Sequence, residues 1–138
     1  MNFSRATGNG VELRQVIHRD PEGTPFPSGA ERFTSLTLAS EDGKPLAECK
    51  QAVLALVSSS FNTGLKISRE KNKVVSWGKE PVLVTRVGAT IVAPCLQGLR
   101  WKMIDFNEKV LAEGTVGADG LIRVPVNKAV WLTELNRP

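Results

Sequence analysis

Residues that favour turns recur about every ten to fifteen positions along this chain, and the segments between them are short and rich in Val, Ile, Leu and Thr. The turn motifs include Gly8-Asn9-Gly10, Asp42-Gly43, Asn62-Thr63-Gly64 and Asp119-Gly120. Short β-prone segments at this spacing are typical of sandwiches or barrels built from antiparallel strands. The sequence therefore predicts an all-β fold, an antiparallel β-sandwich of about seven to nine strands with at most one short helical turn.

Several segments show the pattern of individual strands. Residues 99–103 alternate apolar and polar side chains, and Asn107-Glu108 after them predicts a hairpin, with Asp119-Gly120 opening the next one. Residues 82–92 form one long β-branched segment, in which Gly88 predicts a bend or a bulge.

Residues 45–57 are compatible with either a helix or a buried strand. Their apolar side chains recur at helical spacing, and Pro45 suits a first helical position. Residues 52–57, however, are continuously apolar, as in a strand that is buried on both faces. We expect a short helical turn at residues 46–50, followed by a strand over residues 51–60.

The hydrophobic core is expected in the most apolar of these segments. The side chains predicted to be buried are Leu54, Leu56, Val84, Ile91, Val124 and Trp131. Trp101 shares a strand face with Met103 and is also expected inside. Trp77 lies in a loop-like stretch and is the tryptophan most expected to be exposed.

The length and charge of the chain limit its class. Its 138 residues, of which 41% are hydrophobic, match a single domain over residues 1–138, and no apolar run approaches the roughly 18–20 residues that cross a bilayer. The net charge is +4, but the most basic stretch, residues 66–73, has no interleaved aromatic residues. That stretch predicts a solvated loop, the alternative being a weak, salt-sensitive affinity for polyanions. We expect no membrane or nucleic-acid partner, and residues 1–10 lack the pattern of a signal peptide.

No residues in the sequence match a catalytic or metal-binding motif. His18 is the only histidine, the serines lack a nucleophile motif, and the Asp and Glu residues fall mostly at turns. The two distant cysteines, Cys49 and Cys95, cannot form a zinc site with one histidine. We expect them to be two buried thiols, with one disulfide as the alternative. The sequence thus predicts a chain that is not an enzyme and has no catalytic residues, metal or cofactor.

Several motifs follow one another between residues 33 and 135. They are Asp42-Gly-Lys-Pro-Leu-Ala-Glu48, an apolar strand, Phe61-Asn62-Thr63-Gly64, Trp77-Gly-Lys-Glu-Pro-Val-Leu-Val84 and a final hairpin. This order resembles the C-terminal immunoglobulin-like β-sandwich of large bacterial glycoside hydrolases. Phe61 stands where that family commonly has Glu, Cys49 replaces its usual Ser, and Lys66 stands where a Trp often follows.

The resemblance implies a non-catalytic accessory module of immunoglobulin-like topology. Such a module binds a polysaccharide or packs against the catalytic domain of a parent glycoside hydrolase, and it is extracellular or periplasmic if that enzyme is secreted. Indole rings stack on apolar sugar faces, and Lys and Asn offer hydrogen-bond donors. The candidate carbohydrate-binding residues are Trp77, Lys79, Asn72, Lys73 and Trp101. The alternative is a structural or protein–protein interaction domain with no ligand.

Overall fold

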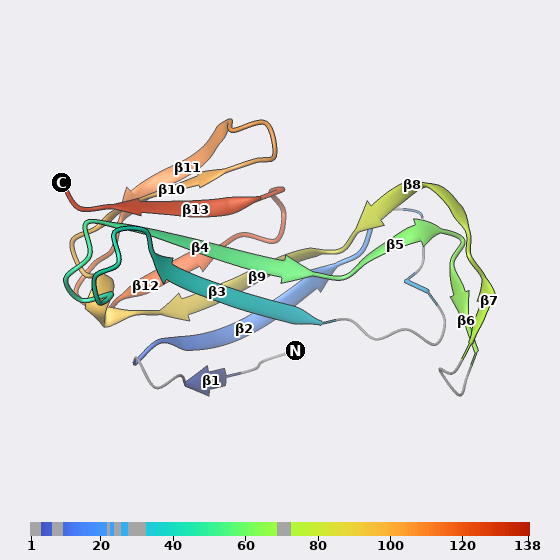
Figure 1. Ribbon diagram of the computed structural model, residues 1–138, viewed down its shortest axis with the longest axis horizontal. Coiled ribbons are helices and arrows are strands. Elements are labelled where there is room, and N and C mark those ends of the chain that lie inside the picture. Colours follow the sequence, from blue (N-terminus) through green and yellow to red (C-terminus); the bar gives the residue numbers. More distant parts are fainter. Residues whose placement is uncertain (1–3, 7–9, 22, 24–25, 28–32, 69–72) are drawn as a thin grey trace.

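The computed structural model describes residues 4–6, 10–21, 23, 26–27, 33–68 and 73–138, and it is built from antiparallel strands (Figure 1). The helix in these residues is one 3-10 turn, η1 (Pro94–Leu96). The predicted all-β class is therefore confirmed. The strand labels run to β13, beyond the expected number. Two segments predicted to be continuous are interrupted, at Ser59 and Thr85, and the short strands β1, β6 and β7 add to the count.

One sheet has the strand order β1–β2–β9–β12. These strands span Ser4–Ala6, Glu12–Arg19, Arg86–Val92 and Leu121–Val124. The pairing of β2 with β9 is interrupted by a bulge between Arg14 and Ile17, and Ile17 pairs with Gly88 just beyond it. The bulge expected at Gly88 thus lies in the partner strand, and Gly88 itself allows a close approach, since a Cβ would overlap the backbone nitrogen of Val126.

The other large sheet has the strand order β11–β10–β13–β4–β3. These strands span Val110–Thr115, Arg100–Ile104, Leu132–Asn136, Gln51–Ser58 and Thr34–Ser40. The hairpin predicted around Asn107-Glu108 is confirmed, because β10 pairs with β11. The second hairpin, at Asp119-Gly120, is wrong: β12 pairs with β9, so the chain crosses to the other sheet at this turn.

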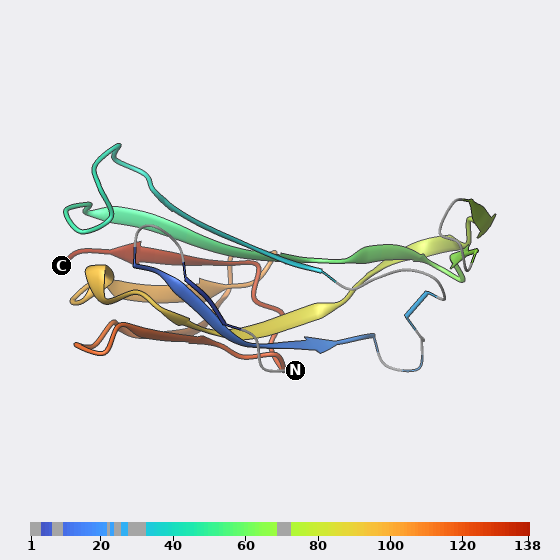
Figure 2. The same cartoon turned by 90° about the horizontal axis from the view of Figure 1, so that it is seen from below.

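Buried apolar side chains from both sheets form one core cluster. Its largest fully buried members are Leu54, Ile91, Leu96, Leu99, Met103, Ile122, Leu135 and Val116. In Figure 2, β3 and β4 lie on one side of this part of the molecule, and β2 and β9 lie on the other. We call this part, which contains the two large sheets, the body.

The predicted core is confirmed in part. Leu54, Ile91 and Val124 are buried, and Leu56 is half-buried against the core cluster. Val84 and Trp131 were expected inside, but they are 58% and 56% exposed. Val84 lies in a strand that has left the body. Trp131 donates its N–H to the Ile104 carbonyl at 2.7 Å, but its ring packs against the exposed Phe106 and not into the core.

The other strands form an arm that projects from one end of the body (Figures 1 and 2). In the arm, β5 (Ser60–Thr63) pairs with β8 (Lys79–Val84), and β6 (Lys66–Ile67) pairs with β7 (Val74–Ser76). β5 follows β4 and β8 precedes β9, so the two long strands of the arm lead into different sheets of the body.

Hydrogen bonds hold the arm at its junction with the body, which we call the neck. The buried Thr85 donates its N–H to the Ser59 carbonyl at 3.0 Å and its hydroxyl to Asp20 Oδ1 at 3.1 Å. Ser58 donates its hydroxyl to the Thr85 carbonyl, and Phe33 donates its N–H to Ser59 Oγ at 3.2 Å. The polar groups at the neck are thus paired with one another, as buried polar groups require.

The short helical turn expected at residues 46–50 is confirmed only in part, because it is not continued as a helix. A single turn forms there, with the Glu48 N–H bonded to the Pro45 carbonyl at 2.9 Å, and β4 begins at Gln51 as predicted. The carboxylate of Asp42 accepts hydrogen bonds from the Lys44 and Lys50 N–H groups. These bonds connect Asp42 to both sides of the loop.

Candidate functional site

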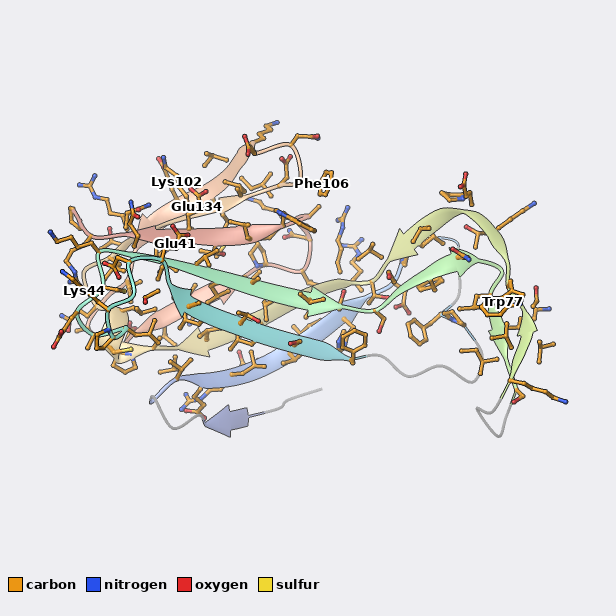
Figure 3. The ribbon with its side chains drawn as sticks, in the orientation of Figure 1. Glu41, Lys44, Trp77, Lys102, Phe106 and Glu134 are labelled. Carbon is orange, nitrogen blue, oxygen red and sulfur yellow. The ribbon has the colours of Figure 1, made fainter. Side chains whose placement is uncertain are left out.

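Trp77 is the most exposed tryptophan, as predicted, with 73% of its surface accessible. It lies between β7 and β8 on the arm, where Figure 3 shows it far from the body. Its carbonyl accepts a hydrogen bond from Asn62 Nδ2 at 3.1 Å. The next residue, Gly78, has a φ of +73°, and a Cβ there would overlap the Thr63 carbonyl oxygen. The backbone at Trp77 is therefore held by the hydrogen bond from the Asn62 side chain. It is also held by the close contact between Gly78 and the Thr63 carbonyl, which only glycine permits.

Two of the predicted donors lie on the arm with Trp77. Lys79 is the first residue of β8 and Lys73 directly precedes β7, and both side chains are exposed. Asn72, the third predicted donor, lies outside the described residues. The arm therefore combines an exposed ring with exposed ammonium groups.

Trp101 is not part of this surface. It belongs to β10 in the body, and its half-buried ring packs against the core cluster. Its indole also covers Gly114 on β11, the residue with which it pairs across the strands. The expected burial of Trp101 agrees with this position, whereas its candidate role beside Trp77 is not supported because the two rings lie on different parts of the molecule.

The sequence reasoning missed the exposed apolar side chains of the arm. Val75, Val82 and Val84 are all more than half exposed, and so is Val57 at the end of β4. In β8 only Leu83 is even half-buried. The β-branched pattern of this segment suggested a core strand, but a strand of a two-stranded arm has no second layer to cover it.

A second exposed aromatic site lies on the body. The rings of Phe106 and Trp131 meet edge to face, with centroids 5.0 Å apart and planes at 81°. Phe106 follows β10, and Figure 3 places it on the body, away from Trp77. The two exposed aromatic sites therefore do not form one continuous platform.

His18 and the Asp, Glu and Cys side chains are the groups relevant to acid–base catalysis or metal binding. His18 lies near the end of β2, where its Nε2 is hydrogen-bonded to Thr34 Oγ1 at 2.7 Å. In the described part of the chain, no group of three or more His, Cys, Asp or Glu side chains is arranged to hold a metal ion.

The two cysteines are free thiols, which agrees with the expectation of buried thiols for Cys49 and in part for Cys95. Cys49 is buried and donates to the Leu46 carbonyl at 3.3 Å, and burial raises the pKa of its thiol. Cys95 is half-exposed. A raised pKa lowers the thiolate fraction, so Cys49 is poorly suited to nucleophilic chemistry.

A surface hollow with a volume of about 390 Å³ lies at the opposite end of the body from the arm. Its lining residues are Leu38, Ser40, Lys44, Pro45, Leu46, Ala47 and Cys95. It contains neither an aromatic ring nor a carboxylate, so its lining offers no acid–base pair and no stacking surface.

Comparisons with known proteins provide no independent information on the fold or on the site. Searches of family models, curated proteins and solved structures each found no match to this chain. Among the described residues, the search for a helix of sufficient length and apolarity to span a membrane found none. The resemblance to accessory domains of glycoside hydrolases therefore stays a prediction.

Proposed function

We propose that this chain is a non-catalytic interaction domain that binds a partner protein through its arm. In this proposal the body is a β-sandwich of immunoglobulin-like topology, whose role is to hold the arm in place. The shared core of the two large sheets supports that architecture.

The observation that carries the proposal is the exposed apolar surface of the arm. Val75, Trp77, Val82 and Val84 are between 58% and 73% exposed, although they lie within 10 positions of one another in the sequence. Isolated apolar residues are common on protein surfaces, but several large exposed apolar side chains on one short element are typical of an interaction site. A two-stranded ribbon is also marginally stable by itself, so contact with a partner would stabilise it.

The charges on the arm indicate the kind of partner. The described part of the arm carries the exposed lysines Lys66, Lys73 and Lys79, against one exposed acid, Glu80. A protein groove with an apolar floor and an acidic rim would match both features. The catalytic domain of a parent glycoside hydrolase is the partner that the sequence resemblance implies.

Site-specific photo-crosslinking in the native host tests this proposal. We expect a photoreactive residue at Val82 to yield one discrete adduct, which mass spectrometry identifies as a protein with an acidic surface. The same residue at Val110, an exposed apolar position on the body, is the matched control and should yield no such adduct. An adduct that forms equally at both positions, or that persists unchanged after Trp77→Ala and Val84→Ser, would contradict binding through the arm.

Polysaccharide binding is the second candidate, and the exposure of Trp77 favours it. One indole ring stacked on a sugar, with Lys73 and Lys79 as donors, gives weak binding, on the order of micromolar to millimolar. The absence of a second ring beside Trp77 among the described residues makes this candidate the weaker one. Under this candidate, Trp77→Ala reduces the affinity for a soluble glycan at least tenfold, about 1.4 kcal/mol, and leaves the melting temperature unchanged. Fluorescence titration of both proteins against a glycan panel measures it, and an equal lack of response excludes it.

A further inference from the structure

The outer edge of β3 lacks the features that usually protect a sheet edge. Its sequence, Thr-Ser-Leu-Thr-Leu-Ala-Ser, contains no charge and no proline, and its pairing with β4 has no bulge. Natural edge strands are shielded by short length, charges, prolines or bulges. The other edges of the large sheets have such shields: β1 has 3 residues, β12 carries Arg123, and β11 carries Glu113 and pairs through a bulge. On its outer side, β3 pairs with no described strand.

The backbone groups on this open edge can be assigned from the pairing with β4. The Glu41 N–H donates to the Gln51 carbonyl at 2.8 Å, in the register that pairs β3 with β4. Backbone groups of alternate residues in a strand point to opposite sides. The odd-numbered residues of β3 therefore bond to β4. The N–H and carbonyl groups of Thr34, Leu36, Leu38 and Ser40 point outward.

The sequence of β3 is complementary to itself in the antiparallel direction. With Thr37 at the centre, Leu36 faces Leu38 of the second strand, Ser35 faces Ala39, and Thr34 faces Ser40. In a two-fold symmetric interface, when a residue of one copy faces a second residue of the other copy, the second residue of the first copy faces the first residue of the other. The pairs named above follow this rule. In this register Leu36 is paired with Leu38 and Thr34 with Ser40, and all four have backbone groups that point outward. The outward N–H groups of one copy therefore meet the outward carbonyl groups of the other.

We propose that two copies of this chain associate through β3, in an antiparallel pair centred on Thr37 that joins the two five-stranded sheets into one. The half-buried Leu36 and Leu38, which pack against the core cluster, then lie next to the same side chains of the second copy. The hollow lined by Leu38, Ser40 and Pro45 borders the C-terminal half of β3, where the second copy's Leu36 is placed by this register. This surface is separate from the arm, so the proposal does not depend on the proposed function.

Sedimentation analysis of charge variants tests the association. Thr37 is exposed and sits on the proposed two-fold axis, so Thr37→Lys or Thr37→Glu places like charges opposite each other. The wild type and Thr37→Val should sediment as dimers, each charged variant alone as a monomer, and an equimolar mixture of the two charged variants as a dimer. Val75→Lys, which adds the same charge on the arm, is the control and should remain dimeric.

Disulfide trapping tests the register. Two residues at the centre of a non-hydrogen-bonded pair have Cα atoms about 4.5 Å apart, which suits a disulfide. In a Cys95→Ser background, Thr37→Cys should therefore form a covalent dimer on mild oxidation. Ser35→Cys should not, because its counterpart lies about 13 Å away along the strand. A wild-type chain that stays monomeric at several hundred micromolar, a Thr37→Lys dimer, or equal trapping at both positions would overturn the proposal.

Discussion

Trp101 and Gly114 face each other across β10 and β11, and the small residue decides where the large one lies. The indole lies over the Cα of Gly114, where a Cβ would overlap two of its ring carbons. This contact keeps Trp101 half-buried on the body and unavailable to a ligand at the arm. Aromatic rings are known to cover cross-strand glycines in this way.

The first prediction concerns this contact. Gly114→Val is expected to push the indole of Trp101 out of place and to lower the free energy of unfolding by about 1–3 kcal/mol, the usual cost of overpacking. Urea denaturation followed by tryptophan fluorescence measures both effects. Gly117→Ala is the control, since a Cβ there approaches only the Asp119 carboxylate. Equal stability of Gly114→Val and the wild type would show that the ring does not depend on this glycine.

The second prediction separates the true core from apolar residues that look alike in the sequence. Leu54 is 1% exposed and Val84 is 58% exposed. Leu54→Ala should lower the free energy of unfolding by about 2–5 kcal/mol, because it leaves a cavity. Val84→Ala should change it by less than about 0.5 kcal/mol, as expected of an exposed site. Denaturant titration of both variants checks this, and a large loss for Val84→Ala would place that side chain in a packed environment.

Among the elements, the loop from β3 to β4 is organised by one carboxylate. The N–H of Lys50, and to a smaller extent that of Lys44, donates to Asp42 and lowers the pKa of its carboxyl group. Because this pKa is lower in the folded than in the unfolded chain, the stabilisation is present above the ordinary value of about 3.9. It is lost as the pH falls through the folded-state pKa. The side chain is fully exposed, so solvent screens the effect and keeps it small.

The third prediction follows from this sign. Asp42→Asn should lower the melting temperature slightly at pH 7, and the melting temperatures of variant and wild type should approach each other as the pH falls toward 2 and the wild-type carboxyl gains a proton. Thermal melts across this pH range provide the measurement. Glu41→Gln, a neighbouring exposed carboxylate, is the control. A difference that stays constant from pH 7 to pH 2 would mean that the carboxylate charge has no part in holding the loop.

The elements also show which parts of the fold could be read from the sequence. Period-two alternation located β10, and the Asn107-Glu108 turn located its hairpin partner, because both signals are local. The pairing of β12 with β9 is not a local property, so Asp119-Gly120 was read as a second hairpin when it carries the chain between sheets. At Leu46 to Lys50 the helical spacing did not produce a helix, and the loop there carries side-chain-to-backbone hydrogen bonds from Lys44 and Lys50 to Asp42, which apolar periodicity does not reveal.

At the scale of the whole molecule, the arm explains why the candidate site was only partly predicted. Loop-like neighbours correctly indicated an exposed Trp77. Residues 82–84 looked like the start of a core strand because β-branched residues favour strands without indicating what covers them. Whether β8 meets a second layer depends on where β4 and β9 diverge, and that is decided at the neck by Ser59 and Thr85. Trp101 was grouped with Trp77 by residue type, although its strand face places it on the body.

Because the arm joins β4 of one sheet to β9 of the other, it has a consequence for the order in which the chain folds. Residues 60–84 form a local hairpin, and closing a short loop costs less entropy than bringing two distant strands together. Once β5 and β8 have paired, β4 and β9 are held near each other, so the core closes from an anchored pair. The arm should thus belong to the folding nucleus even though it adds little to the core.

The fourth prediction tests this order. Phe61 is the buried aromatic residue of β5 and contacts Phe26 edge to face, with centroids 5.5 Å apart. Phe61→Leu should slow folding more than it accelerates unfolding in stopped-flow chevron measurements, whereas Leu135→Ala, in the last strand, should mainly accelerate unfolding. If Phe61→Leu mainly accelerates unfolding and Leu135→Ala mainly slows folding, the body forms first and the strands of the arm pair afterwards. If the predicted order holds, the segment that is most exposed in the native molecule is the one that its folding relies on first.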